Sequence, residues 1–409
     1  MKIKFNLDKI IINTAIGLLM IKILFSYINV EFGWWQRDLI PNFDKYNFLG
    51  LPDDYSKKIE FLLIPLIGIY ILKNLKYLRN KSLLTLVGIV MIGLNILTSI
   101  FTSTPILSSL EYSLKLMSPI FLFVCLLIHY EKYQFDIKKM MVRILIFCCC
   151  LSLIGYLFLE GSYNHNKIWL PIYFSSVHTH SYVLVIIAIG FSYLLYEKRK
   201  YKEFLIFTAF YLAFLYFGHR VRTPMVLYLV YIFFITILMH DYFKFIWVNL
   251  IIFIPILGMF YLLFSDFNLN EFSSGRMVMY EAKYEMLKGY NVLEYLFGRG
   301  KGSDFIVTDY WIRQEKNSHN DLLTFFVENG IPYTFLFLFM IFSLMIVHKK
   351  IKIIYSGIVL GYLLTSFLSN GLVLRPIASY LLFIVLAYIA VNPTDLTKKK
   401  NMFKYKLKL

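Results

Sequence analysis

Charged side chains are scarce in this sequence of 409 residues: they make up 16% of the chain, whereas hydrophobic residues make up 59%. A soluble domain is about 25% charged and about half apolar, and a soluble core of this length does not need so much apolar surface. The composition therefore excludes an ordinary soluble globular protein. About twelve stretches are apolar and approach the roughly twenty residues that cross a bilayer. The sequence predicts a polytopic membrane protein.

Cysteine is rare as well, and the four cysteines all lie in apolar stretches, at Cys125, Cys148, Cys149 and Cys150. In such surroundings cysteine behaves as a small hydrophobic residue. The spacing supports neither a disulfide framework nor a zinc site. His178 and His180 form a His-x-His pattern with His165 nearby, but no carboxylate or cysteine cluster completes a metal site. We therefore predict no metal and no other cofactor.

Internal repeats, low-complexity tracts and a leader-cleavage site are also missing. The first apolar segment, residues 10–28, follows a short basic start and has no small-residue cleavage site before Glu31. We expect this segment to be retained as a first membrane helix, because a cleaved signal peptide needs such a site.

The net charge of +17 would indicate nucleic-acid binding only if the basic residues formed a continuous patch. Instead they cluster in short runs that separate apolar stretches and fall in every second loop, at 73–81, 132–143, 198–202, 349–352 and 398–408. This is the positive-inside pattern of membrane proteins. We therefore expect anionic membrane lipid as a partner and no nucleic acid.

The predicted fold class is all-α, with residues 1–409 forming a single polytopic membrane domain of about twelve transmembrane helices. The expected spans are residues 10–28, 59–72, 83–101, 117–129, 144–159, 182–196, 204–219, 225–239, 245–264, 322–347, 353–369 and 377–391. The charge pattern places both termini in the cytoplasm. It places the largest loop, residues 265–321, on the outer side.

The large outer loop contains one predicted amphipathic helix. Ser274 is a suitable helix cap, and Gly289 stands where a helix ends. Between them, four apolar side chains share one helical face: Met277, Tyr280, Tyr284 and Leu287. Such a helix is expected to lie on the membrane surface or to pack over the ends of the spans. A long outer loop with its own helix is where we expect function.

Arg220 and Arg222 follow an apolar span at the outer membrane boundary, in the segment Gly-His-Arg-Val-Arg-Thr-Pro. Arginine at this depth is costly unless it is paired or reaches the headgroups. One interpretation is two arginines that extend to the lipid surface. The other is a fork for a phosphate, which guanidinium geometry suits.

Arg276 opens the amphipathic helix, where free N–H groups favour an anion; the alternative is a solvated arginine. Three alternating glycines follow, at Gly298, Gly300 and Gly302, without the strand and spacing of a nucleotide-binding loop. They indicate either a flexible turn or a close approach of the backbone to substrate.

His319 and Asn320 lie at the outer mouth of the tenth predicted span, and Glu328 lies inside its apolar region. Histidine titrates near neutrality, so His319 is a candidate general base; a capping or packing role is the alternative. A carboxylate inside a membrane span is by default functional or paired.

Taken in order, these segments resemble the bacterial O-antigen polymerase and ligase superfamily. The resemblance covers about residues 218–347 and lies in Arg-Thr-Pro (222–224), Ser-Gly-Arg (274–276), Leu-Phe-Gly-Arg-Gly-Lys-Gly (296–302), Ser-His-Asn-Asp-Leu-Leu (318–323) and Glu-Asn-Gly-Ile (328–331). The sequence departs from the family pattern at Pro332, where a second small residue is usual. This departure concerns helix packing and not the expected chemistry.

The resemblance implies a membrane glycosyltransferase scaffold of type C that works without metal at the periplasmic face of the inner membrane. The donor is a sugar chain on undecaprenyl pyrophosphate. Arg222 and Arg276 would hold the pyrophosphate, with Arg220 as a neighbour or substitute. His319 would take the proton from the attacking hydroxyl, and the anomeric carbon would invert. Possible support comes from Glu328, Asn320, Gly300, His178 and His180.

Within this superfamily, a polymerase transfers the chain to a lipid-linked repeat unit, and a ligase transfers it to the lipid A core. The chain is rich in Ile, Lys, Phe, Tyr and Asn, a composition common among serotype-specific polymerases, so we expect a polymerase and a chain-length regulator as a further partner. The alternative from another class is a lipid-linked oligosaccharide flippase. That alternative predicts repeat symmetry and polar residues in both halves, whereas here they concentrate in the second half.

Overall fold

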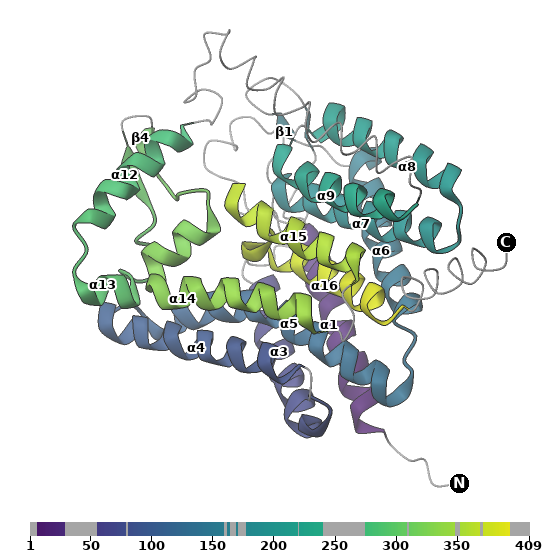
Figure 1. The fold of residues 1–409 in the computed structure, drawn as a ribbon, viewed down its shortest axis with the longest axis horizontal. Coiled ribbons are helices and arrows are strands. Elements are labelled where there is room, and N and C mark those ends of the chain that lie inside the picture. Colours follow the sequence, from purple (N-terminus) through teal and green to yellow (C-terminus); the bar gives the residue numbers. More distant parts are fainter. Residues whose placement is uncertain are drawn as a thin grey trace, which may run out of the picture.

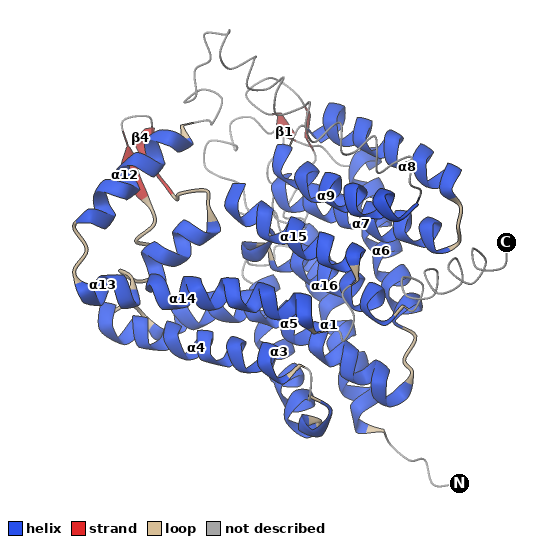
Figure 2. Ribbon diagram, in the orientation of Figure 1, coloured by secondary structure: helices blue, strands red, loops and turns tan. Residues whose placement is uncertain are grey.

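The protein is almost entirely helical (Figure 1). The computed structural model describes residues 6–28, 55–78, 81–158, 162–163, 169–170, 177–219, 221–239, 275–308, 311–347, 352–368 and 371–392. Figure 2 shows that, within these residues, strands are confined to two small antiparallel pairs. These are β1 (Ser162–Tyr163) with β2 (Trp169–Leu170), and β3 (Ile306–Thr308) with β4 (Trp311–Lys316).

The helices before the large outer loop are α1 (Leu7–Ile28), α3 (Tyr55–Lys73), η2 (Leu75–Tyr77), α4 (Ser82–Thr102), α5 (Ile106–Tyr133), α6 (Ile137–Phe158), α7 (Val177–Glu197), α8 (Tyr201–Phe214), η3 (Leu215–His219) and α9 (Arg222–Met239). The later helices are α12 (Arg276–Lys288), α13 (Val292–Phe297), α14 (Asp321–Ile346), α15 (Ile353–Leu368), η4 (Leu372–Leu374) and α16 (Pro376–Val391).

Six of the described helices, α1, α4, α5, α6, α7 and α14, are long and apolar enough to cross a membrane. Shorter apolar helices, α9, α15 and α16, accompany them. The predicted span 245–264 lies outside the described residues, and the described residues of every other predicted span are almost entirely helical. The prediction of a helical membrane protein is confirmed, while the number of twelve spans and their orientation stay predictions.

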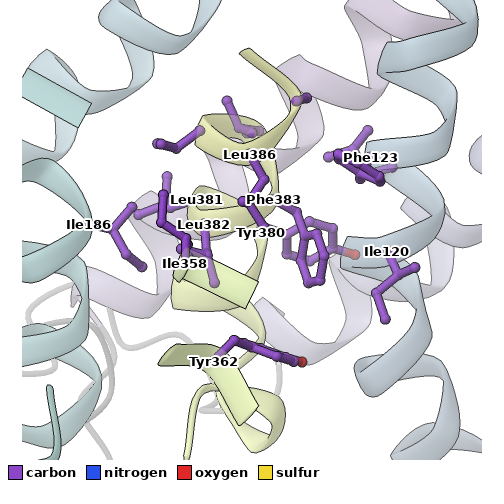
Figure 3. Close-up of a cluster of buried hydrophobic side chains, with 14 of the residues drawn as sticks. Ile120, Phe123, Ile186, Ile358, Tyr362, Tyr380, Leu381, Leu382, Phe383 and Leu386 are labelled. Carbon is purple, nitrogen blue, oxygen red and sulfur yellow. The ribbon is translucent and has the colours of Figure 1, made fainter. Parts of the chain in front are cut away.

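Helix α16 forms the centre of the core. It carries no charged side chain, and every residue from Ile377 to Ala390 is buried. A helix that is apolar on all sides is stable only when other elements surround it. Figure 3 shows α16 side chains meeting Ile120 and Phe123 of α5, Ile186 of α7 and Ile358 of α15. The last span in sequence is therefore the helix around which the others pack.

Helix α14 is broken near its middle. Gly330 has φ 82° and ψ −179°, which is not helical, and Pro332 follows two residues later. Proline has no N–H to donate to the carbonyl four residues earlier, and its ring clashes with that carbonyl. The residue that departs from the family pattern thus marks a helix break, which leaves two helical segments, residues 321–329 and 331–346.

The described residues of the segment predicted as the large outer loop, 275–308 and 311–321, are more structured than the sequence analysis predicts. The amphipathic helix is present as α12 and ends at Gly289, but its N-cap is Gly275 and not Ser274. Gly275 takes this position because φ there is 77°, which favours glycine. The predicted all-helical class misses the β-pairs, and helix α13 was not predicted. In Figure 1, α12, α13 and β4 lie together beside one end of α14.

A charged pair is buried among the spans. The Lys22 ammonium nitrogen lies 3.2 Å from Glu60 Oε2, and both side chains are 4% exposed. Ser118 Oγ donates to Glu60 Oε1 at 2.8 Å and the Tyr380 hydroxyl donates to the same oxygen at 3.3 Å. These contacts join α1, α3, α5 and α16. A buried charge that loses its partner is strongly destabilising, whereas loss of both charges often is not.

We therefore expect Lys22→Met to lower the free energy of unfolding by about 3–5 kcal/mol, because Glu60 loses its charged partner in an apolar site. The double variant Lys22→Met/Glu60→Leu should recover most of this loss. Thermal unfolding of purified protein in detergent measures both effects. Lys9→Met, at an exposed position of the same helix, is the matched control. A double variant less stable than Lys22→Met contradicts the prediction.

Candidate functional site

The site is built at the start of α14. Asn320 is the N-cap, and its Oδ1 accepts from the N–H groups of Leu322 at 3.1 Å and Leu323 at 3.2 Å. His319, directly before it, has a left-handed backbone with φ 49°. Few residues other than glycine adopt this region, and it costs energy unless neighbouring contacts enforce it. The Asn320 side chain therefore caps the backbone at the start of α14. Neighbouring contacts hold His319 in its left-handed conformation.

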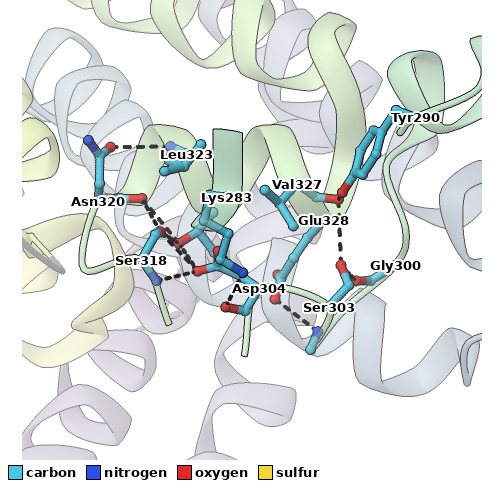
Figure 4. Close-up of polar contacts among 12 residues, drawn as sticks. Lys283, Tyr290, Gly300, Ser303, Asp304, Ser318, Asn320, Leu323, Val327 and Glu328 are labelled. Carbon is cyan, nitrogen blue, oxygen red and sulfur yellow. Dashed lines mark hydrogen bonds and ion pairs between the residues drawn. The ribbon is translucent and has the colours of Figure 1, made fainter. Parts of the chain in front are cut away.

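Asp304 anchors the other side of this turn (Figure 4). Its Oδ2 accepts from the Ser318 N–H at 2.9 Å, from Ser318 Oγ at 3.0 Å and from Thr324 Oγ1 at 2.7 Å. Its Oδ1 lies 3.2 Å from the Lys283 ammonium nitrogen, and both side chains are fully buried. The pair connects α12, the loop before β3 and the start of α14. His319 therefore follows a residue with both backbone and side chain fixed.

The glycine segment docks onto the break in α14. The Arg299 N–H donates to the Val327 carbonyl at 2.9 Å, and the Gly300 N–H donates to the Glu328 carbonyl at 3.0 Å. Within an unbroken helix these two carbonyls would pair with residues 331 and 332. The Glu328 side chain accepts from the Gly302 N–H at 2.8 Å (Figure 4). The glycines thus allow the backbone to approach α14 closely. Gly300 and Glu328 form part of this contact through their hydrogen bonds.

Arg276, the first residue of α12, is half-buried, and its guanidinium donates to the Leu368 carbonyl at the end of α15. Arg222 begins α9, although its side chain lies outside the described part of the chain, as does all of Arg220. Helix α9 packs against α15, with Leu227 beside Gly361 and, about two turns later in α9, Phe234 beside Gly357. In this antiparallel arrangement Arg222 comes level with the last turn of α15. The packing therefore places the backbone of Arg222 level with the end of α15 that the Arg276 side chain contacts.

Burial and neighbouring positive charges act on the His319 imidazole. Burial is the main cause, followed by Arg276, Lys316 and Arg375, and together they lower the pKa of His319 to about 4, against a weaker opposite effect of Asp304. A cationic imidazole is disfavoured in such surroundings. His319 is therefore neutral near pH 7 and free to accept a proton.

The two histidines of the His-x-His pattern, His178 and His180, have different surroundings. His178 lies in the first turn of α7, where the charges of Arg375 and Arg276 reach it and where it interacts with His319. His180 is buried, with Nε2 3.2 Å from Ser152 Oγ of α6. His178 therefore belongs to the group around His319, and His180 packs between α7 and α6.

Arg375 was not identified from the sequence, yet it reaches the same group. The side chain donates to Thr179 Oγ1 at 3.2 Å and lies over the Tyr182 ring, 5.8 Å from its centroid. The signal was available, because Arg375 stands just before the predicted span 377–391, as Arg222 stands just before the predicted span 225–239. Asp304 and Lys283, by contrast, have no sequence signal.

Four side chains that are distant in sequence thus act on one another: Arg276 from α12, His319 before α14, His178 from α7 and Arg375 before α16. Two guanidinium groups near the neutral imidazole of His319 form a site that can bind an anion and accept a proton. No family model matches this chain, and no curated protein matches it.

Proposed function

We propose that this chain is a surface-polysaccharide polymerase of the O-antigen type, a metal-independent glycosyltransferase that uses a polyprenyl-pyrophosphate-linked glycan. The proposal depends on one observation. Arg276 and Arg375 act electrostatically on the neutral imidazole of His319 in a protein of apolar helices. Such a transfer requires groups that bind the phosphates of the donor and a group that accepts the proton of the acceptor. The resemblance in the sequence supplies the substrate class.

In the proposed reaction Arg276 binds the pyrophosphate of the donor. A charge-assisted hydrogen bond contributes about 1.5–3 kcal/mol, and a fixed guanidinium favours the additional negative charge that gathers on the leaving group. Arg222, level with the same end of α15, is the second proposed ligand, and Arg220 is its neighbour. The bond between the anomeric carbon and the phosphate oxygen breaks, and its electron pair leaves with the pyrophosphate.

His319 accepts the proton of the attacking hydroxyl as the new glycosidic bond forms on the opposite face of the sugar, which inverts the anomeric carbon. Burial, together with the positive neighbours, keeps the imidazole neutral before substrate arrives. When the anionic donor binds, its charge offsets theirs and raises the pKa of His319. The base therefore becomes stronger only when the leaving group is in place.

We further propose that the protein lies in a bacterial inner membrane, with both termini in the cytoplasm and this site at the periplasmic face. The support is the distribution of lysine and arginine between the loops and the apolar helices themselves. On this orientation α12, α13 and β4 lie outside, where polymerisation of lipid-linked repeat units takes place. A chain-length regulator remains the expected protein partner.

The proposal is tested by reconstitution of the purified chain in liposomes with a polyprenyl-pyrophosphate-linked oligosaccharide. A ladder of longer lipid-linked glycans is the expected product. Transfer only to added lipid A core would identify a ligase, and movement of intact donor across the bilayer would identify a flippase. Recovery of unchanged donor on its original side, with protein that is folded and correctly oriented, would show that the proposal is wrong.

A further inference from the structure

Helix α13 has an apolar face that the described structure leaves exposed. The exposed fractions are 74% for Val292, 55% for Leu293 and 42% for Leu296. With about 3.6 residues per turn, these three side chains share one side of the helix. Glu294 points to the opposite side, where its carboxylate accepts from the Arg299 guanidinium at 2.8 Å. The short helix is therefore amphipathic, and the face directed away from the protein is the apolar one.

Contacts with two of the candidate membrane helices fix the position of α13. Its last residue, Phe297, stacks on Phe101 of α4 with ring centroids 4.3 Å apart. Its backbone also packs closely on α14, because a Cβ at Gly330 would lie 2.4 Å from the Leu296 carbonyl oxygen. In Figure 1, α13 lies at the end of α4 and beside α14. The exposed face is thus held against the apolar helices and does not project from a free loop.

The exposed face of α13 adjoins exposed apolar residues of both helices. Phe101 and Ile100 are exposed where α4 ends, and Ile331 is exposed directly after the break in α14. Further exposed apolar residues follow along the two helices, at Leu86, Ile89, Val90 and Leu97 of α4 and at Phe335, Phe339, Phe342 and Ile346 of α14. A contiguous apolar surface of this length is rare on a protein in water. On membrane helices it is the surface that acyl chains cover.

Amphipathic side chains and paired charges border this face. The Lys288 ammonium nitrogen lies 2.7 Å from Glu285 Oε1 and 4.5 Å from the centroid of the exposed Tyr284 ring. Arg299 follows α13 and is paired with Glu294. Tyrosine and long basic side chains are typical of the membrane interface, because they have an apolar body and a polar end. The border of the face thus matches the level of the lipid headgroups.

We infer that α13 is an interfacial membrane helix and that lipid is the partner of its exposed face. Val292, Leu293 and Leu296 lie among the acyl chains at one surface of the bilayer, as the apolar sides of interfacial helices do. Lipid is favoured over a second protein because the face adjoins the exposed sides of α4 and α14. Part of the segment predicted as an outer loop is therefore in the membrane interface. This inference does not depend on the proposed reaction.

The experiment measures the access of lipid to single labelled cysteines in the full-length chain, reconstituted in phosphatidylcholine liposomes. Cys149→Ala and Cys150→Ala first remove the two cysteines that are not buried. A nitrobenzoxadiazole fluorophore is then attached at Leu293→Cys. Ile89→Cys, exposed within α4, is the reference for lipid contact, and Glu315→Cys, exposed on β4, is the reference for water. Phosphatidylcholine with brominated acyl chains quenches a fluorophore that it contacts.

Brominated lipid should quench the fluorophore at Leu293 nearly as strongly as at Ile89 and leave the fluorophore at Glu315 unquenched. Equal emission and equal lack of quenching at Leu293 and Glu315 would place the face in water and overturn the inference. Emission typical of apolar surroundings without quenching by brominated lipid would show that protein covers the face, which also contradicts it. Energy transfer between labelled chains would then identify a second copy. Val292→Cys, on the same face, decides if the label at Leu293 unfolds the protein.

Discussion

Replacement of His319 by alanine is expected to lower the turnover number by about 10²–10⁴-fold, which is the usual contribution of a general base, while donor binding is retained. Donor affinity should persist because the proposed pyrophosphate ligands are on other elements, α12 and α9. His319→Gln should keep the hydrogen-bonding shape of the residue and still be inactive, since it has no basic nitrogen. Turnover and donor affinity are measured in the same reconstituted assay.

The pH dependence gives an independent test of the same residue. A base works in its deprotonated form, and the pKa of His319 is lowered from 6.5 to about 4. The value of kcat/KM, which reports the free enzyme, should therefore not fall as the pH drops from about 8 to about 5. The acidic limb of kcat should lie at higher pH, because bound donor raises the pKa.

Two results would contradict the base role. One is a limb of kcat/KM near the ordinary histidine pKa that persists in His319→Gln. The other is a His319→Ala variant that loses donor affinity and keeps its turnover number, which would make His319 a binding group. The base would then be sought first at His178, the other histidine in the same electrostatic group.

Gly330→Ala is expected to destabilise the protein strongly, because the substitution combines backbone strain with a steric clash. With φ 82° and ψ −179°, Gly330 occupies a backbone region open almost only to glycine, and a side chain there costs about 1–3 kcal/mol. A Cβ would also lie 2.4 Å from the Leu296 carbonyl oxygen, and both backbones are held by hydrogen bonds. We expect thermal stability to fall and the glycine segment to detach from α14.

Two other glycines provide graded controls. Gly302 has φ 92°, but a Cβ there would meet nothing within 4 Å, so Gly302→Ala should show the cost of backbone strain alone. Gly93, inside α4, has neither positive φ nor a neighbour within 4 Å, so Gly93→Ala should be neutral or slightly stabilising. The expected order of stability is Gly93→Ala, then Gly302→Ala, then Gly330→Ala. Equal stability of the first and the last would disprove the tight docking.

Hydropathy alone predicted the long apolar helices, because a membrane span is a local property of about twenty residues. The end of α12 at Gly289 was predicted from an equally local signal, a glycine that stops a helix. Helix α13 was missed although its signal was present, since Asn291 and Glu294 form a reciprocal capping box. The break in α14 could not be located from Pro332 alone, because proline within a span also occurs without one, as at Pro65 in α3 and Pro119 in α5.

The candidate site was predicted in part for the same reason. His319 and Arg276 belong to short recognisable segments, and Arg375 carried the signal of an arginine at a span end. The support beneath His319 was not predictable, because Asp304 gains its role only when Lys283, Ser318 and Thr324 fold around it. Gly300 and Glu328 were selected as possible support for chemistry, whereas their described contacts are with each other's segments.

The docking of the glycine segment onto α14 also has a kinetic consequence. Amide protons in loops usually exchange with solvent quickly, whereas those of a core helix exchange only when the helix opens. The amides of Arg299 and Gly300 donate to the Val327 and Glu328 carbonyls of α14, so their exchange requires the separation of the two segments. In deuterium uptake this stretch of loop is therefore expected to exchange as slowly as the helix, and its protection would report whether α12 and α13 remain docked on α14.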